Sequence, residues 1–206
     1  MAAIWYWHPY LHRVATRLVH GRHYAARLRR VAALIGKDSS VLDLGCGTCA
    51  LAQFLDPSVE YEGWDLNERF IRFGRRRGLK VKAKDCFEYR GSPEADVIIL
   101  SDILHHVSLV RRERLLTTAF RFARKKVVVV EPFHAPYHPY WWAVALRRRL
   151  GLESFLGDYD GINKEKESYR ILTKQQLLTF FTKHHSLTIL EEGKALLAVF
   201  APYPHV

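Results

Sequence analysis

The apolar and polar positions divide most of the chain into short apolar runs and longer segments with helical spacing. Runs of four to six apolar residues bounded by turn residues are typical of strands buried on both faces. Strands are predicted at residues 41–44, 60–65, 80–84, 96–101 and 126–131, and the last of these is such a run. Helical spacing occupies residues 48–55, 68–78, the segment from about Ser108, and 174–184. The alternation predicts parallel strands connected by crossover helices.

Turn and capping residues support these boundaries. Asn67 is placed to cap one helix and Gly78 to end it, while Thr173 and Gln176 form a T-x-x-Q capping box. The last strands are expected on either side of Gly193, and their short turn makes them an antiparallel pair. The prediction is a Rossmann-like α/β fold: a seven-stranded, mostly parallel sheet with a terminal antiparallel strand and helices on both faces.

The chain shows no repeat or linker, so we predict a single domain over residues 1–206. Residues 1–37 contain two helical patterns separated by Gly21, after an aromatic start, IWYWHPY. Residues 132–170 are rich in proline and tryptophan, with a short helix expected around 141–150. The family resemblance described below implies that both segments cover the acceptor site as lids. The alternative is that their Trp, Tyr and Arg residues anchor the protein at a membrane surface.

Composition and charge restrict the classes of partner, the compartment and the metal sites that the chain can have. No apolar run approaches the ~20 residues of a membrane span. The net charge is +11, and residues 1–37 contain no acidic residue. Basic patches suit phosphate in RNA or on an anionic lipid surface, or are simply solvated. The three cysteines indicate a reducing compartment, so we expect a cytoplasmic protein, with a peripheral position at the membrane as the alternative. Their C-x-x-C lacks the second ligand pair of a zinc site, so no metal is expected.

The segment VLDLGCGTCALAQFL, residues 41–55, places Asp43 near the end of a strand, just before a glycine turn. In such sheets the ligand lies beyond the carboxyl ends of the strands. Gly45 and Gly47 allow a ligand to approach the backbone closely. A dinucleotide is one candidate, with Asp65 on its ribose. However, Asp43 repels a pyrophosphate and attracts the ammonium and sulfonium groups of S-adenosylmethionine.

Four segments, in this order, resemble motifs of class I S-adenosylmethionine-dependent methyltransferases. They are VLDLGCGT, YEGWDLN, KAKDCFEY and ADVIILSDILHHV, and the resemblance covers roughly residues 25–131. One departure is Cys49, which replaces the third glycine of the first motif. The resemblance implies S-adenosylmethionine as the cofactor.

The resemblance also implies which residues hold the cofactor. The methionine part is assigned to the glycine turn, the ribose and adenine to the ends of the next two strands, and the mouth of the site to the end of the fourth. In chain order these residues are Asp43, Gly45, Cys46, Gly47, Asp65, Leu66, Asp85, Cys86, Phe87 and Ser101.

A general base is needed if the acceptor atom carries a proton. His105 and His106 follow the fourth strand and titrate near neutrality, so either can serve; the alternative is that they only pack. Asp102 and Glu131, at nearby strand ends, are further candidates.

The acceptor is predicted to be small and apolar, aromatic or lipid-like. The N/D-P-P-Y/F motif of enzymes that methylate the amino groups of DNA bases or protein glutamine is replaced by SDIL, and LHHV resembles enzymes of small molecules, quinones and lipids. RNA is the alternative, because some tRNA wobble-uridine methyltransferases have a histidine pair followed by two arginines, like Arg111 and Arg112 here. A less favoured alternative is a non-catalytic protein of this fold that binds RNA or a partner.

Overall fold

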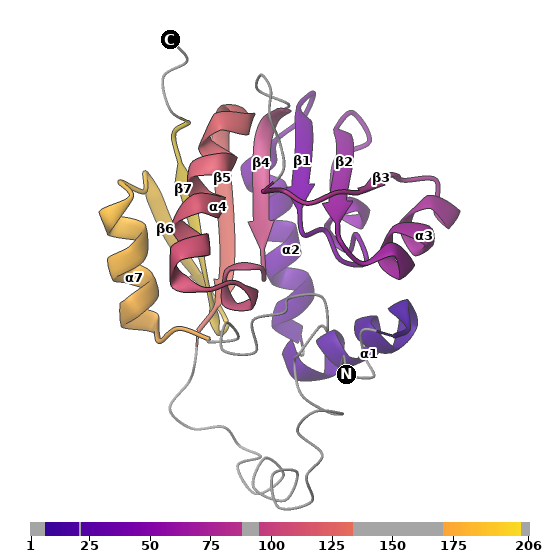
Figure 1. Cartoon of the computed structure of the whole chain (residues 1–206), viewed down its shortest axis with the longest axis horizontal. Helices are drawn as coiled ribbons and strands as arrows, with labels where there is room; N and C mark the ends of the chain where they lie inside the picture. Colours follow the sequence, from indigo (N-terminus) through magenta and orange to yellow (C-terminus); the bar gives the residue numbers. More distant parts are fainter. Residues whose placement is uncertain (1–6, 21, 88–94, 134–170, 203–206) are drawn as a thin grey trace, which may run out of the picture.

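A single seven-stranded sheet forms the centre of the protein in this computed structural model, which describes residues 7–20, 22–87, 95–133 and 171–202. The strand bounds are β1 Ser40–Leu44, β2 Glu60–Asp65, β3 Lys80–Ala83, β4 Ala95–Ser101, β5 Ala123–Pro132, β6 Thr188–Glu192 and β7 Ala195–Phe200. The strands lie in the order β3-β2-β1-β4-β5-β7-β6 (Figure 1). β7 is antiparallel to both of its neighbours, and the other pairs are parallel. This confirms the predicted fold.

The described helices cover both faces of this sheet. Their bounds are α1 Pro9–His20, α2 Arg22–Ile35, η2 Leu51–Gln53, α3 Glu68–Arg76, η3 Leu104–His106, α4 Leu109–Phe122 and α7 Lys174–Lys183. Asn67 caps α3 by accepting a hydrogen bond from the backbone of Arg69, and Thr173 and Gln176 form the predicted capping box at α7. Both helices begin and end within two residues of where the pattern places them.

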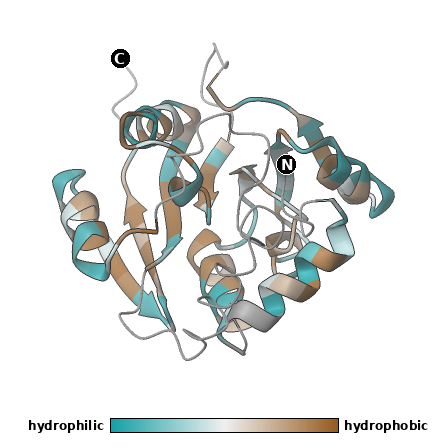
Figure 2. Cartoon of the chain, turned by 60° about the horizontal axis from the view of Figure 1, so that its bottom comes forward, coloured by the Kyte–Doolittle hydropathy of each residue, from teal (hydrophilic) through white to brown (hydrophobic). Residues whose placement is uncertain are grey.

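Alternate residues along the central strands pack on opposite faces of the sheet. Ile98 of β4 lies in the apolar cluster that contains Leu116 of α4 and Phe181 of α7. Its neighbour Ile99 lies in the cluster that contains Val31 of α2. Figure 2 shows the central strands as mostly hydrophobic and α3, at the edge, as mostly hydrophilic. Burial on both faces explains why these strands are continuous apolar runs.

The helix predicted at residues 48–55 is wrong. The chain forms a turn and then the single 3-10 turn η2. Gly47 and Cys49 both have left-handed φ angles, 51° and 53°, and such residues cannot continue a right-handed helix. Residues 45–55, all of them described, therefore lack a helix N-terminus of the kind that binds pyrophosphate.

The predicted division into a core and two covering segments stays a prediction. The described part of residues 1–37 forms α1 and α2. The segment 132–170, with its expected helix around 141–150, lies outside the described residues apart from its first two positions. None of the described helices combines the length and apolar character needed to span a membrane.

Candidate cofactor and active site

Asp43 lies near the carboxyl end of β1, in the middle of the sheet, and its side chain is buried. Its Oδ2 accepts a hydrogen bond of 2.8 Å from the Tyr61 hydroxyl on β2. Its Oδ1 is also buried and has no hydrogen-bond partner among the described residues. Burial raises the pKa of Asp43 to about 7, and the nearby charges of Asp65 and Asp102 act in the same direction. An unpartnered buried carboxylate oxygen is well suited to a cationic ligand.

The glycine turn is held against β2 by its backbone. Gly45 donates a hydrogen bond of 2.8 Å to the carbonyl of Trp64. Gly45 has a φ of +74°, and a Cβ there would lie 2.5 Å from Cδ1 of Ile103. No described atom lies within 4 Å of the place a Cβ on Gly47 would take. The turn therefore needs glycine at position 45 for packing, while the backbone at position 47 is open to a ligand.

Asp65 connects β2 to this turn. Its Oδ2 accepts a hydrogen bond of 2.8 Å from the Gly47 N–H, and its Oδ1 accepts one of 2.7 Å from the Asn67 N–H. The carboxylate that the resemblance assigns to the ribose is thus fixed beside the open backbone. Leu66, the next residue, has 47% of its surface exposed, which leaves it accessible for the predicted contact with adenine.

Cys49 takes the place of a third glycine because its thiol fills a space under α3. It is fully buried and lies in an apolar cluster with Ile71. Its Sγ is 3.7 Å from that of Cys46 and 3.3 Å from where a Cβ on Gly74 would lie. The contact with Cys49, followed by burial, raises the pKa of the Cys46 thiol. Raised thiol pKa values are typical of structural cysteines.

The turn after β3 carries the residues assigned to the adenine. Oδ1 of Asp85 accepts a hydrogen bond of 2.9 Å from the Phe87 N–H, which shapes the turn. Cys86 and Phe87 pack against the main core, and burial raises the pKa of Cys86 to about 12. The guanidinium groups of Arg111 and Arg114 lie 5.8 and 5.5 Å from the centre of the Phe87 ring. Two arginines of α4 thus pack on the Phe87 ring.

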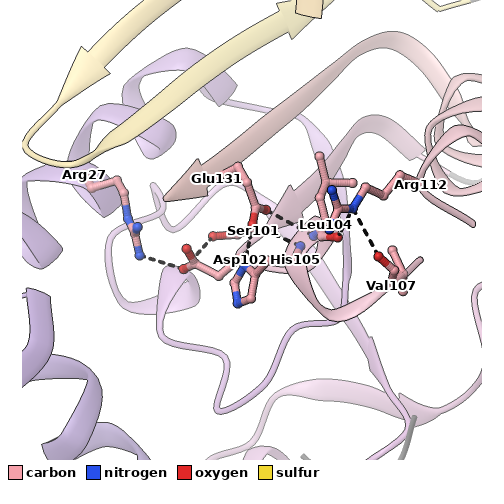
Figure 3. A network of polar contacts seen from close by, with 8 residues as sticks. All are labelled: Arg27, Ser101, Asp102, Leu104, His105, Val107, Arg112 and Glu131. Atoms are coloured by element: carbon pink, nitrogen blue, oxygen red, sulfur yellow. Dashed lines mark hydrogen bonds and ion pairs between the residues drawn. The ribbon is translucent and has the colours of Figure 1, made fainter. Parts of the chain in front are cut away.

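His105 and Glu131 form a buried pair between the ends of β4 and β5 (Figure 3). Glu131 accepts hydrogen bonds of 3.1 Å from the backbone N–H groups of Leu104 and His105, and it also contacts Nδ1 of the His105 ring. A carboxylate at Nδ1 selects the tautomer with its proton on Nδ1, so Nε2 becomes the accepting nitrogen. The His106 ring lies 4.2 Å from that of His105, and burial, followed by the charge of His105, lowers the pKa of His106.

Asp102 is held by an arginine that the sequence interpretation missed. Nη2 of Arg27, on α2, lies 2.6 Å from Oδ2 of Asp102, and the hydroxyl of Ser101 donates to the same oxygen at 3.5 Å (Figure 3). Asp102 has a left-handed φ of 56°. Arg27 is nearly fully buried, and Tyr24 stacks on it at 5.4 Å. The available signal was an arginine on the apolar face of a predicted helix, three residues after Tyr24.

We expect Arg27→Ala to destabilise the protein by about 2–4 kcal/mol, because it leaves the Asp102 carboxylate without its buried counter-charge. The free energy of unfolding from urea titration measures this. Asp102→Ala alone and the Arg27→Ala/Asp102→Ala double variant complete a mutant cycle. If the double variant is as unstable as the sum of the two single variants, the ion pair does not connect α2 to the β4 end.

The structure therefore brings most of the predicted residues together at one edge of the sheet. Asp43, Gly45, Gly47 and Asp65 form one connected group, through hydrogen bonds and the shared turn. The residues at the ends of β4 and β5 form a second group, and the turn after β3 a third. Tyr61 was missed, although its alternation with Gly63 and Asp65 along β2 indicates that it shares their face.

Comparison with known proteins agrees with this arrangement. Residues 41–126 match a family model described as a methyltransferase domain. A trans-aconitate 2-methyltransferase of Mycolicibacterium gilvum is 32% identical over 90 residues, which is 42% of this chain and 34% of that protein. The match thus spans about a third of the length of this curated relative.

Solved structures show the same fold. N-methyltransferase NodS from Bradyrhizobium japonicum WM9, in complex with S-adenosyl-L-homocysteine, has a TM-score of 0.56 at 19% identity, over 89% of this chain and 86% of NodS. An O-methyltransferase family protein from Burkholderia thailandensis has a TM-score of 0.63 at 15% identity, over 95% of this chain and 61% of that one.

The sheet order and the glycine turn define a Rossmann-like fold with an acidic residue near the end of its first strand. The domain match over residues 41–126 agrees with the resemblance of the sequence to class I S-adenosylmethionine-dependent methyltransferases. Its residues also fit that cofactor. The unpartnered Oδ1 of Asp43 suits an ammonium group, and the open backbone at Gly47 leaves room beside it.

Proposed function

We propose that this chain transfers a methyl group from S-adenosylmethionine to a small acceptor whose nucleophilic atom carries a proton. The observation that supports this most is the buried, unpartnered oxygen of Asp43 beside the open backbone of Gly47. A protein of this fold that no longer binds the cofactor has no reason to keep a buried carboxylate oxygen without a partner, because doing so costs free energy of folding. When bound, S-adenosylmethionine supplies a methyl group on a cationic sulfur.

In this proposal His105 removes the acceptor's proton. Glu131 holds the ring by its Nδ1 side, so the proton is accepted at Nε2, and the buried carboxylate stabilises the imidazolium that forms. Asp102 has a different part, because its carboxylate is paired with Arg27. It holds the loop after β4 in place and acts as a positioning residue.

A small acceptor is favoured over RNA by the position of Arg112. This arginine is the second of the pair that resembles tRNA methyltransferases, but it has only 1% of its surface exposed. Its Nε donates to the carbonyl oxygens of Leu104 and Val107 at 2.6 and 3.1 Å, so it holds η3 in place (Figure 3). A buried arginine cannot contact a phosphate backbone. The curated relative named above is named for a small molecule, trans-aconitate. We therefore propose a small acceptor; that it is apolar or lipid-like is carried over from the sequence prediction.

Two measurements test this function. Calorimetry with S-adenosylmethionine and S-adenosyl-L-homocysteine should show binding, and NAD, the competing dinucleotide, should show none. Methyl-labelled S-adenosylmethionine is then incubated with the protein and either a lipid and small-molecule extract or total tRNA. We expect label in the solvent-extractable fraction. Absence of cofactor binding contradicts the whole proposal, whereas label in tRNA contradicts only the acceptor.

We expect the affinity for S-adenosylmethionine to fall about ten-fold when the pH is lowered from 8 to 6. Burial raises the pKa of Asp43 to about 7. The carboxylate is thus ionised at pH 8 and mostly protonated at pH 6, where it no longer attracts an ammonium group. Calorimetry at each pH measures the dissociation constant, and proton release on binding near pH 7 provides an independent readout. A dissociation constant that does not change over this range would mean that Asp43 does not face the cofactor.

A further inference from the structure

Helix α1 and the residues before it expose an apolar stripe to solvent. Trp7, Tyr10, Leu11 and Val14 have 47%, 64%, 47% and 55% of their surfaces exposed. Val14 follows Tyr10 and Leu11 by four and three residues, which places these three on one side of the helix, and Trp7 lies two residues before the helix begins. In Figure 1, α1 lies at the edge of the molecule where β1, β2 and β4 end. A contiguous exposed apolar surface marks a site of interaction.

The orientation of this stripe is set by the packing of α1 on α3. The Tyr10 ring, at the margin of the stripe, meets Phe73 of α3 edge-on, with ring centres 5.2 Å apart. The His12 ring lies 4.9 Å from Phe70, also on α3. α1 is thus docked on α3, and the stripe faces outward as a consequence of that docking.

Cationic side chains gather beside the stripe. Burial lowers the pKa of Arg13, and the nearby charges of Arg77 and Arg17 lower it further. The guanidinium groups of Arg13 on α1 and of Arg77 at the end of α3 lie 5.9 and 5.5 Å from the centre of the same ring, Phe73, so cations from both helices gather at one place. Arg75 and Arg76 add two exposed charges at the end of α3. Residues 7–37 contribute no carboxylate to balance them.

We propose that the stripe of α1, with the arginines beside it, docks on an anionic lipid bilayer. The apolar side chains enter the boundary between headgroups and acyl chains, and the arginines contact the lipid phosphates. This orientation brings the carboxyl edge of the sheet, which carries the site, close to the membrane. The proposal concerns binding alone and does not depend on the proposed reaction.

The aliphatic residues favour a bilayer over the other partners. RNA is bound by arginines and by aromatic rings on which bases stack, and Leu11 and Val14 offer neither contact. A second copy of the chain would place one arginine cluster against another and be repelled. Only a surface with an apolar interior and negatively charged headgroups matches both the apolar stripe and the arginines beside it.

Flotation with vesicles tests the proposal. The wild-type protein should bind vesicles of phosphatidylcholine mixed with phosphatidylglycerol, bind phosphatidylcholine alone much more weakly, and dissociate as salt is raised. We expect Leu11→Ser/Val14→Ser to lower the partition coefficient about ten-fold or more. Arg17→Gln should lower it about five-fold.

Matched controls come from the opposite edge of the sheet. Leu187, just before β6, is exposed to 67%, and Arg121, near the end of α4, is an exposed arginine. Leu187→Ser and Arg121→Gln should bind vesicles like the wild type. Circular dichroism and calorimetry with S-adenosylmethionine establish that every variant is folded.

Three outcomes would overturn the proposal. The first is absence of binding to anionic vesicles at low salt, or equal binding by the stripe and control variants. The second is tight RNA binding that survives Leu11→Ser/Val14→Ser but not Arg17→Gln, which would make the surface an RNA site. The third is a dimer in the absence of lipid that only the stripe variant dissociates, which would make it an interface between copies.

Discussion

Asp43→Asn is expected to weaken the binding of S-adenosylmethionine by at least about 30-fold, corresponding to about 2 kcal/mol or more. The substitution keeps the size of the side chain, and its amide oxygen can still accept the hydrogen bond from the Tyr61 hydroxyl. It removes the charge that attracts the ammonium group. The pH dependence of binding between pH 6 and 8 should disappear with it. Calorimetry at both pH values measures the two effects together.

The same variant should change the stability of the ligand-free protein in the opposite direction. The pKa of Asp43 is raised from 3.8 to about 7 in the folded protein. Its contribution to stability is therefore complete below about pH 4 and is lost as the pH rises through 7. The asparagine side chain does not ionise, so the stability of Asp43→Asn relative to wild type should improve between pH 5 and pH 8 in thermal unfolding. Asp38→Asn, at an exposed loop position, is the control.

These two readouts separate cofactor binding from folding. A variant that loses both affinity and stability at pH 8 would show that Asp43 serves the fold. A variant that keeps full affinity would show that the cofactor does not use this carboxylate.

Replacing His105 with asparagine is expected to lower kcat by about 10²–10⁴-fold, the usual contribution of a general base. Glu131→Gln should have an effect of similar size. An amide that donates to Nδ1 selects the tautomer with its proton on Nε2, which then cannot accept one. The KM for S-adenosylmethionine should change little, because the Asp43 and Gly47 group is separate. Steady-state kinetics with the acceptor found in the labelling experiment, over a range of pH, provides the measurement.

His106→Asn is the discriminating control. Its ring packs against that of His105, but burial lowers its pKa well below the ordinary value. We expect a change in kcat of less than about ten-fold, the size of a packing effect. If His106→Asn is the inactive variant and His105→Asn is not, the assignment of the base is reversed.

The fold was largely predictable because its signals are local. Continuous β-branched runs such as residues 126–131 indicate strands buried on both faces, and Asn67 and Thr173 mark helix starts through their own hydrogen bonds. The meeting of the candidate cofactor residues at one edge of the sheet was predictable for a related reason. Residues at the carboxyl ends of parallel strands meet at one edge of a sheet, wherever they lie in the chain.

The features that the sequence predicted wrongly or did not predict involve residues whose partners are distant in sequence. The helix expected at residues 48–55 is absent, because the thiol of Cys49 packs under α3 and its backbone takes a left-handed conformation. The pairs of Arg27 with Asp102 and of His105 with Glu131 join residues 75 and 26 positions apart. No local pattern predicts such pairs, since they depend on how α2 and β5 are placed against β4.

By itself, therefore, the sequence determined the order of the elements, the class of fold and the acidic glycine turn, all of which follow from periodicity and local backbone chemistry. Only the tertiary structure decided the roles of the ionisable groups. It left Oδ1 of Asp43 without a hydrogen-bond partner among the described residues. It also paired His105 with Glu131 and Asp102 with Arg27. The reason is physical: the state of an ionisable side chain depends on its burial and on the charges around it, and the packing of distant segments creates both.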